Sequence, residues 1–387
     1  MNYLQSAQAL YEQMVRDRRH LHQHPEVGMD LPETCSYVMA RLTEMGYQPR
    51  RLGGGVTATL TGKPDGKVFL LRADMDALPM REESGLPFAS QRSCAHTCGH
   101  DMHTAMLLGA AQLLRDRAAE LNGTVKFMFQ PGEEVLSGAR SMIEAGILED
   151  PHVDAAMGAH MIPMIPAGLG GYGTGVVSAS SDHLVIRVEG RGGHGAHPQS
   201  TVDPINIGVH IHLALQELLS READPAELVV LTFGKFQGGD AANIIPSSAV
   251  LEGTLRTFSE PLRTHLLERI DTICTCTAEA FRGRAQVTDL CSTCSLQIDG
   301  DTAAAVAQGW QREGLKMLQQ GEKMSGSEDF AEIAARVPST FFVVGGGTAQ
   351  DGCGVSLHNP KIRFREEALI YGAAAYASGA AMWLELH

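Results

Sequence analysis

The chain has 387 residues, of which 44% are hydrophobic and 20% charged, an ordinary composition for a globular protein with room for two domains. Its formal net charge of −14 argues against nucleic acid or an anionic membrane surface as a partner, because both attract basic patches. No apolar run reaches the roughly 20 residues of a membrane span, and the N-terminal residues lack the basic and apolar regions of a secretory signal. We therefore expect a cytoplasmic protein with neither a nucleic-acid nor a membrane partner.

The first third of the chain alternates between helical and strand patterns. Short apolar runs are typical of strands buried on both faces, and they occur at residues 68–71, 125–129 and 153–159. Helix-like periodicity lies between and before them, at residues 4–22, 33–46, 104–117 and 137–146. The last third repeats the pattern, with helices expected at 301–318 and 366–384 and a strand at 340–344. Alternating strands and helices predict a mainly parallel sheet covered by helices.

The middle of the chain has a different order of elements. We expect strands at 183–188, 227–236, 249–258 and 285–290, with helices at 204–220 and 260–281. This β-α-β-β-α-β order is the ferredoxin-like arrangement. The sequence therefore predicts an α/β catalytic domain made of residues 1–181 and 294–387, with a ferredoxin-like α+β domain, residues 182–293, inserted into it.

The densest group of chemically active side chains lies just before an expected helix, in the run His96-Thr97-Cys98-Gly99-His100-Asp101-Met102-His103. Thiolate and imidazole groups are good ligands for zinc and similar ions. Loops between strands and helices often carry the sites of open α/β sheets. A rival interpretation is a catalytic cysteine, because a helix N-terminus would lower the pKa of Cys98.

Further candidates follow other expected strands. Glu133 and Glu134 come just after the strand 125–129. Two adjacent carboxylates are explained if one of them binds metal and the other takes a proton from water. His160 ends the strand 153–159, and His358 lies in a loop of the last third. A complete set of five ligands, enough for two ions with open positions, is then Cys98, His100, Glu134, His160 and His358.

Two aspartates, Asp74 and Asp76, follow the strand 68–71. Imidazoles that bind metal usually donate their second N–H to a carboxylate or a carbonyl. We assign this supporting role to Asp76 and also to Asp74. The pairs Cys274/Cys276 and Cys291/Cys294 could suggest a structural zinc site, but residues two apart do not share a helix face, so none is expected there.

Several motifs, in one order, resemble the aminoacylase-like dinuclear metallopeptidases, in particular the branch of hippurate hydrolases, N-acyl-amino-acid amidohydrolases and plant auxin-conjugate hydrolases. They extend over nearly the whole chain. They are Arg19-His-Leu-His-Gln-His-Pro-Glu26, Arg72-Ala-Asp-Met-Asp-Ala-Leu-Pro79, Cys98-Gly-His-Asp-Met-His103, Gln130-Pro-Gly-Glu-Glu134, Gly192-Gly-His194, Asn243-Ile-Ile-Pro246, Gly253-Thr-Leu-Arg-Thr-Phe258, Ser327-Glu-Asp-Phe330 and Leu357-His-Asn-Pro360.

The resemblance implies the same fold, with the inserted domain acting as a lid and as a dimerisation domain. It implies the same five metal ligands, with Cys98 bridging both ions and Glu133 as the general base. By similarity, His194 holds the reacting oxygen of the substrate, from its own subunit or from the partner, while Asn243 and Arg256 contact the substrate. His197 lies close to His194 in the sequence, so the choice between them stays partly open.

We therefore predict a hydrolase that cleaves the amide bond of an N-acyl amino acid or a similar small conjugate, with two divalent ions per subunit. Zinc and manganese are the first candidates, and nickel and cobalt are alternatives. The sequence does not distinguish acetyl, benzoyl and other acyl groups. Alternatives are a dipeptidase or carboxypeptidase-like enzyme of the same family, a cysteine-dependent hydrolase, and a binding protein without catalysis. A binding protein has no need of a base, and the Glu133–Glu134 pair therefore argues against it.

Overall fold

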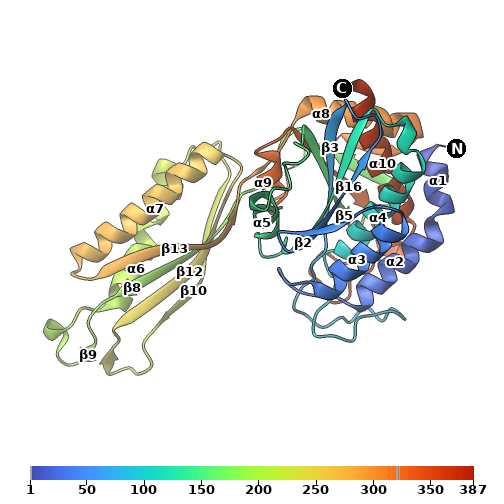
Figure 1. The fold of residues 1–387 in the computed structure, drawn as a ribbon. Helices are drawn as coiled ribbons and strands as arrows, with labels where there is room; N and C mark the ends of the chain where they lie inside the picture. Colours follow the sequence, from blue (N-terminus) through green and yellow to red (C-terminus); the bar gives the residue numbers. More distant parts are fainter. Residues whose placement is uncertain (1, 320, 322) are drawn as a thin grey trace. The chain divides into compact units, whose positions relative to one another are not determined.

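The computed structural model describes residues 2–319, 321 and 323–387. The chain forms two compact units, and the second is inserted into the first (Figure 1). Unit 1 comprises residues 1–177, 297–322 and 329–387, and unit 2 comprises residues 178–296 and 323–328. The predicted insertion, residues 182–293, lies inside the larger segment of unit 2. The short segment 323–328 was not predicted to belong there.

Unit 1 is built on an eight-stranded sheet with the order β1-β2-β4-β3-β5-β16-β6-β15. The central strands β4, β3, β5 and β16 are parallel to one another, and the edge strand β15 is parallel to β6. The antiparallel pairs are β1 with β2, β2 with β4, and β6 with β16. The strands are β1 (Arg50–Leu52), β2 (Gly55–Thr61), β3 (Lys67–Asp74), β4 (Gly123–Gln130), β5 (Ala155–Ile162), β6 (Leu169–Tyr172), β15 (Lys316–Gln319) and β16 (Ser339–Gly345). The predicted mainly parallel, helix-covered sheet is confirmed.

Helices cover this sheet (Figure 1). In unit 1 they are α1 (Tyr3–Ala9), α2 (Tyr11–Gln23), α3 (Pro32–Glu44), α4 (His100–Asp116), α5 (Gly138–Glu144), α8 (Gly300–Glu313), α9 (Ala331–Ala334) and α10 (Ala368–Leu386). Helices α4 and α10 pack against each other and against β3, and nearly every residue of α4 is buried. Strand β3 is buried on both faces, as a central parallel strand should be. These elements form one continuous apolar core.

Unit 2 contains a four-stranded antiparallel sheet with the order β10-β12-β8-β13. Its main elements follow the chain as β8 (Ser181–Glu189), α6 (Pro204–Ala214), β10 (Val229–Gly238), β12 (Ser248–Thr257), α7 (Glu260–Ala280) and β13 (Arg284–Thr293). This is the β-α-β-β-α-β order predicted for the insertion. Two short sheets complete the fold, β9 (Gly193–His194) with β11 (Ile244–Ile245), and β7 (Gly175–Ser178) with β14 (Leu296–Ile298).

Several predicted element bounds are wrong. The helix expected at 301–318 ends at Glu313, because Gly314 adopts a left-handed conformation with φ 76°, and strand β15 follows it. The helix expected from residue 104 begins four residues earlier, at His100. The helix expected at 4–22 is interrupted at Leu10, and the one expected at 204–220 ends at Ala214. Within the described residues, no helix is long and apolar enough to cross a membrane.

Candidate metal centre

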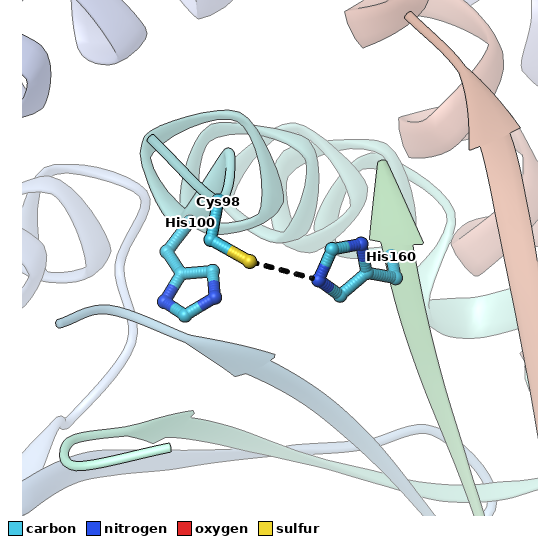
Figure 2. A group of neighbouring side chains, drawn as sticks. All are labelled: Cys98, His100 and His160. Carbon is cyan, nitrogen blue, oxygen red and sulfur yellow. Dashed lines mark hydrogen bonds between the residues drawn. The ribbon is translucent and has the colours of Figure 1, made fainter. Parts of the chain in front are cut away.

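Cys98, His100 and His160 point toward one another at one edge of the unit 1 sheet (Figure 2). Cys98 lies in the loop before α4, His100 is the first residue of that helix, and His160 lies near the carboxyl end of β5. The Cys98 Sγ atom is 3.4 Å from Nε2 of His160. The ligand atoms of all three side chains lie within 4.8 Å of one another.

Glu133, Glu134 and His358 approach the same atoms from two other loops. Nε2 of His100 is 3.9 Å from a carboxylate oxygen of Glu133 and 3.9 Å from one of Glu134. Nε2 of His358 is 3.4 Å from the same Glu134 oxygen. A second group of ligand atoms within 4.8 Å therefore contains Cys98, Glu134 and His358. The structure thus brings together all five side chains predicted as ligands, with Glu133 beside them.

His358 has an unusual backbone conformation, with φ 58°. Such a left-handed conformation is uncommon for a residue other than glycine and is found mostly where the surroundings enforce it. Here the His358 N–H donates to the carbonyl of Thr97, the residue before Cys98, at 3.0 Å. This hydrogen bond joins the two loops and carries the His358 ring toward Glu134.

Asp76 holds the remaining loops in place. Its two carboxylate oxygens accept the backbone N–H groups of Glu133 at 3.0 Å and Glu134 at 3.1 Å. Its backbone carbonyl, rather than its carboxylate, is the close partner of His100 Nδ1 at 2.8 Å. The predicted contact between Asp76 and an imidazole is therefore made by the main chain, with a carboxylate oxygen farther away at 3.5 Å.

The tautomers of His100 and His160 follow from their hydrogen bonds. Nδ1 of each ring faces a backbone carbonyl, that of Asp76 for His100 and that of Met161 for His160, at 2.7 Å for the latter. A carbonyl only accepts hydrogen bonds, so Nδ1 carries the proton in both rings. In the neutral imidazole, Nε2 then offers its lone pair to the centre of the group, which is the arrangement of a metal-binding histidine.

A network of buried charged side chains supports the site, and the sequence did not predict its contacts. Asp74 Oδ1 lies 2.5 Å from Nδ1 of His103, and Nε2 of His103 accepts the N–H of Met161 at 2.8 Å. Arg72, fully buried, donates to Asp74 at 2.7 Å and to Asp329 at 2.8 Å. Asp74 therefore supports His103, which is outside the predicted ligand set. From Nε2 of the ligand candidate His100, the nearest oxygen of Asp74 is farther away, at 3.8 Å.

His96 is the member of the histidine cluster that the structure keeps apart from the site. Burial lowers the pKa of its ring to about 3, so it is neutral. Among the described residues, neither ring nitrogen has a hydrogen-bond partner. His96 belongs to none of the groups of ligand atoms described above.

The donor set fits divalent metal ions. It offers thiolate, imidazole and carboxylate groups, a mixture suited to zinc and related ions. Nε2 of His100 and Oε1 of Glu134 are buried, yet neither has a hydrogen-bond partner in the described part of the chain. Burial alone would lower the pKa of His100, but Asp74 and the other acidic groups nearby raise it well above its usual value. The surroundings therefore favour a positive charge at this position, and a bound cation would supply one.

The family of this chain follows from comparison with known sequences. The sequence model of the peptidase family M20/M25/M40 matches residues 70–381. The chain belongs to this family. The resemblance predicted from the motifs is therefore confirmed, and so is the predicted enzyme class, a hydrolase of carbon–nitrogen amide bonds.

Members of the family with known names align over nearly the whole chain. The N-acetylcysteine deacetylase of Bacillus subtilis (strain 168) is 35% identical over 381 residues, which cover 97% of this chain and 98% of that protein. The IAA-amino acid hydrolase ILR1-like 4 of Arabidopsis thaliana is 36% identical over 383 residues, covering 97% and 86% of the two proteins. The crystal structure of the Bacillus subtilis YXEP protein, a dinuclear metal-binding peptidase of family M20, is 33% identical with a TM-score of 0.82, covering 98% and 99% of the two chains.

The other residues predicted from the family resemblance lie in unit 2. His194, on β9, is exposed, and its neighbour across the ribbon is Ile244 on β11. The backbone carbonyl of Asn243 accepts the N–H of Gly195 at 2.9 Å, so the structure brings His194 and Asn243 close together. Nδ1 of His194 accepts the N–H of Ala196 at 3.1 Å, so the neutral ring carries its proton on Nε2. Arg256 donates to the carbonyl of Ser325 at 3.2 Å.

Proposed function

We propose that this member of the M20/M25/M40 family hydrolyses the amide bond of N-acyl amino acids or related small conjugates with two divalent ions per subunit. Cys98, His100, Glu134, His160 and His358 would hold the ions. The proposal depends on one observation. These five side chains lie between residues 98 and 358 of the sequence, yet they converge in space, with Glu133 beside them. The names of the relatives support the substrate class.

Bound to these ligands, the ions would lower the pKa of a water molecule and polarise the substrate carbonyl. Glu133 would act as the general base that takes the proton of that water and later gives it to the departing amine. Its position supports this role, because its backbone is fixed by Asp76 and its carboxylate reaches to 3.9 Å from His100. Asp76 would act by holding Glu133 and His100 in place rather than by moving protons.

His194 is proposed to stabilise the oxyanion that forms during the reaction. A well-placed donor of this kind contributes roughly 3–4 kcal/mol to the transition state. The ring of His194 offers its Nε2–H as a donor when neutral, because Nδ1 already accepts a backbone hydrogen bond. Asn243, close to His194, and Arg256 are proposed to contact the substrate, and this proposal rests on the family resemblance.

A cysteine-dependent hydrolase is the second candidate, because 3.4 Å between Cys98 Sγ and His160 Nε2 would also suit a Cys–His pair. A nucleophilic thiol needs a lowered pKa, however. Burial raises the pKa of Cys98 to about 12, which is the opposite of activation. The two glutamates and His358 would also have no role in such a mechanism. These observations favour the metal-dependent reaction.

We further propose that the chain forms a homodimer through unit 2. Strand β10 is an edge strand of the four-stranded sheet, and most of its residues are exposed, among them Val230 and Phe236. Helix α6 exposes Val209 and Leu213, and its Gly208 lies against Phe236. An exposed edge and apolar side chains next to it are suited to pairing with a second copy. Light scattering would test this, and a monomer at micromolar concentration would contradict it.

The deciding experiment is amino-acid release from a panel of N-acetyl and N-benzoyl amino acids, hippurate among them, and short peptides. The protein is first treated with a chelator and then reloaded with manganese, zinc, cobalt or nickel. We expect hydrolysis of N-acyl amino acids that disappears with the chelator and returns with metal. Preference for dipeptides would favour the peptidase alternative. Activity that resists the chelator but is lost with a thiol alkylator would contradict the proposal. A cytoplasmic location stays a prediction.

A further inference from the structure

The loop formed by residues 75–99 connects β3 to α4 and carries Cys98 near its end. It contains no helix or strand, and loops of this length without regular structure are uncommon in compact domains unless they have a function. Isolated bridges fix its two ends, Ala77 to Val27 and Leu78 to Ala95. Between these bridges, one backbone hydrogen bond ties the loop to a distant segment, from the N–H of Glu83 to the carbonyl of Pro360 at 2.7 Å, and side chains supply further attachments.

Glu82 is a side chain that holds the middle of this loop, as Arg363 also does by donating to the carbonyl of Ser84 at 2.7 Å. Its side chain is only 3% exposed. One carboxylate oxygen accepts the backbone N–H of Ser90 at 2.7 Å, and the other accepts the hydroxyl of Ser84. The latter oxygen also lies 3.0 Å from Nε2 of His22, on helix α2. A single buried carboxylate therefore joins two points of the loop to a helix.

His22 continues the connection from Glu82 to helix α4. Its Nδ1 atom lies 2.8 Å from Oδ2 of Asp101, while Nε2 faces Glu82. Ionised carboxylates only accept hydrogen bonds, so both ring nitrogens must carry protons to satisfy both partners. The histidine is then a buried cation between two anions.

Asp101 completes the network next to the candidate metal ligands. It is the second residue of α4 and directly follows His100. Nε of Arg18 donates to the same Asp101 oxygen at 2.7 Å, and both side chains are buried. Arg18 and the cationic His22 face the charges of Asp101 and Glu82, and Arg18 also pairs with Glu366 at 3.2 Å, which Arg19 binds as well. Buried charges are stable only when they are paired in this way, so the loss of any member leaves another uncompensated.

We propose that Arg18, His22, Glu82 and Asp101 are positioning residues for the metal centre. The network fixes the loop that carries Cys98 at one point and the first turn of α4, which carries His100, at another. By holding both the loop of Cys98 and the first turn of α4, the network fixes the distance between Cys98 and His100. None of the four side chains belongs to the groups of ligand atoms around Cys98 and His100, so they act through the main chain. This inference rests on the proposed function, because it requires Cys98 and His100 to bind metal.

The test is the Glu82→Gln exchange in the full-length protein. It keeps the size of the side chain but removes the charge that balances His22. We expect the apo-protein to bind zinc at least tenfold more weakly than the wild type, because residues that orient metal ligands typically contribute about 10–100-fold to metal affinity. Affinity is measured by competition with a chromophoric chelator, and the number of bound ions by elemental analysis. Glu82→Asp, which restores the charge, should recover part of the loss.

Asp17→Asn is the matched control. Asp17 precedes Arg18 on α2, is equally buried, and binds Gln13, Tyr37 and Arg41, away from the loop. We expect this variant to unfold at a lower temperature, as Glu82→Gln does, but to bind zinc as tightly as the wild type. This difference separates positioning of the metal ligands from a contribution to stability alone.

The possible results distinguish the inference from the proposed function. If the wild type binds no metal, the proposed function itself fails. If the wild type binds two ions and Glu82→Gln binds them with the same affinity, only the positioning role is overturned. Should Glu82→Gln not fold, Ser84→Ala takes its place, because it removes one attachment of the loop without unbalancing the buried charges. A zinc affinity equal to that of the wild type in this variant would then contradict the inference.

Discussion

The carboxylate of Asp76 accepts a hydrogen bond from the backbone N–H of Glu133 at 3.0 Å, and its second oxygen accepts the N–H of Glu134 at 3.1 Å. The carbonyl of the same aspartate is the partner of His100 Nδ1. One residue in the loop just after β3 therefore sets the position of the proposed base, of one carboxylate ligand and of one imidazole ligand. Its role is to hold three groups that come from the loop after β4 and from the first turn of α4.

Asp76→Asn should weaken the site through this geometry. An amide has only one oxygen, so one of the two backbone N–H groups would face an NH2 donor instead. We expect a loss of about 1–3 kcal/mol in the free energy of unfolding and roughly 10–100-fold weaker metal binding. Asp154→Asn is the control, because Asp154 accepts the N–H of Val68 near the start of β3. Urea unfolding and metal titration measure the two effects, and equal metal affinity in both variants would contradict the assignment.

Glu133→Gln should separate catalysis from metal binding. The amide keeps the size of the side chain but cannot take a proton from water. We expect kcat to fall by roughly 10²–10⁴-fold while the protein still binds two ions, because general base catalysis contributes about this much. Stopped assays of amino-acid release and elemental analysis of the same preparation give the two values. Near-normal turnover would assign the base to another residue.

Metal removal should affect stability and the reactivity of Cys98 together. A ligand that binds only the folded state, at 100 times its Kd, adds about 2.7 kcal/mol to the free energy of unfolding. We therefore expect the unfolding temperature to fall after chelation and to return when zinc or manganese is added. Mass spectrometry should show slower alkylation of Cys98 in the metal-loaded protein. Alkylation at equal rates, with and without metal, would place Cys98 outside the metal site.

The sequence predicted the central strands and the five candidate ligands because both follow from local patterns. Short apolar runs marked β3, β4 and β5, and polar residues after parallel strands gather at one edge of a sheet. The start of α4 was missed because His100 belongs to a run rich in polar residues, which is typical of a loop. Gly99, with φ 89°, makes the turn that allows the helix to begin there.

The supporting networks could not be predicted from the sequence. Arg72 contacts Asp329, 257 residues away, and no periodic pattern reports a single contact between distant charged side chains. The role of Asp76 was only partly predicted for a related reason. A motif identifies an aspartate near the ligands, but whether its carboxylate or its carbonyl faces the imidazole depends on the path of the main chain. Only the folded structure decides between the two.

Gly138→Ala should disturb the centre without changing any of its polar atoms. Gly138 begins α5, and an added Cβ would lie 1.6 Å from the carbonyl oxygen of Pro131, so that oxygen must move. Pro131 lies two residues before Glu133, and its displacement would shift the proposed base and the ligand Glu134. We expect a loss of about 1–3 kcal/mol in the free energy of unfolding, together with weaker metal binding.

The control for this variant is Gly300→Ala at the first residue of α8. A Cβ there meets no atom within 4 Å, so the exchange should be neutral or stabilise the protein by up to about 1 kcal/mol. Both variants are compared by urea unfolding and by zinc competition. If Gly138→Ala bound zinc like Gly300→Ala while losing stability, the loop of Glu133 and Glu134 would have to adjust independently of α5. Its position would then depend on Asp76 alone, and the Asp76→Asn variant should show the larger loss of metal affinity.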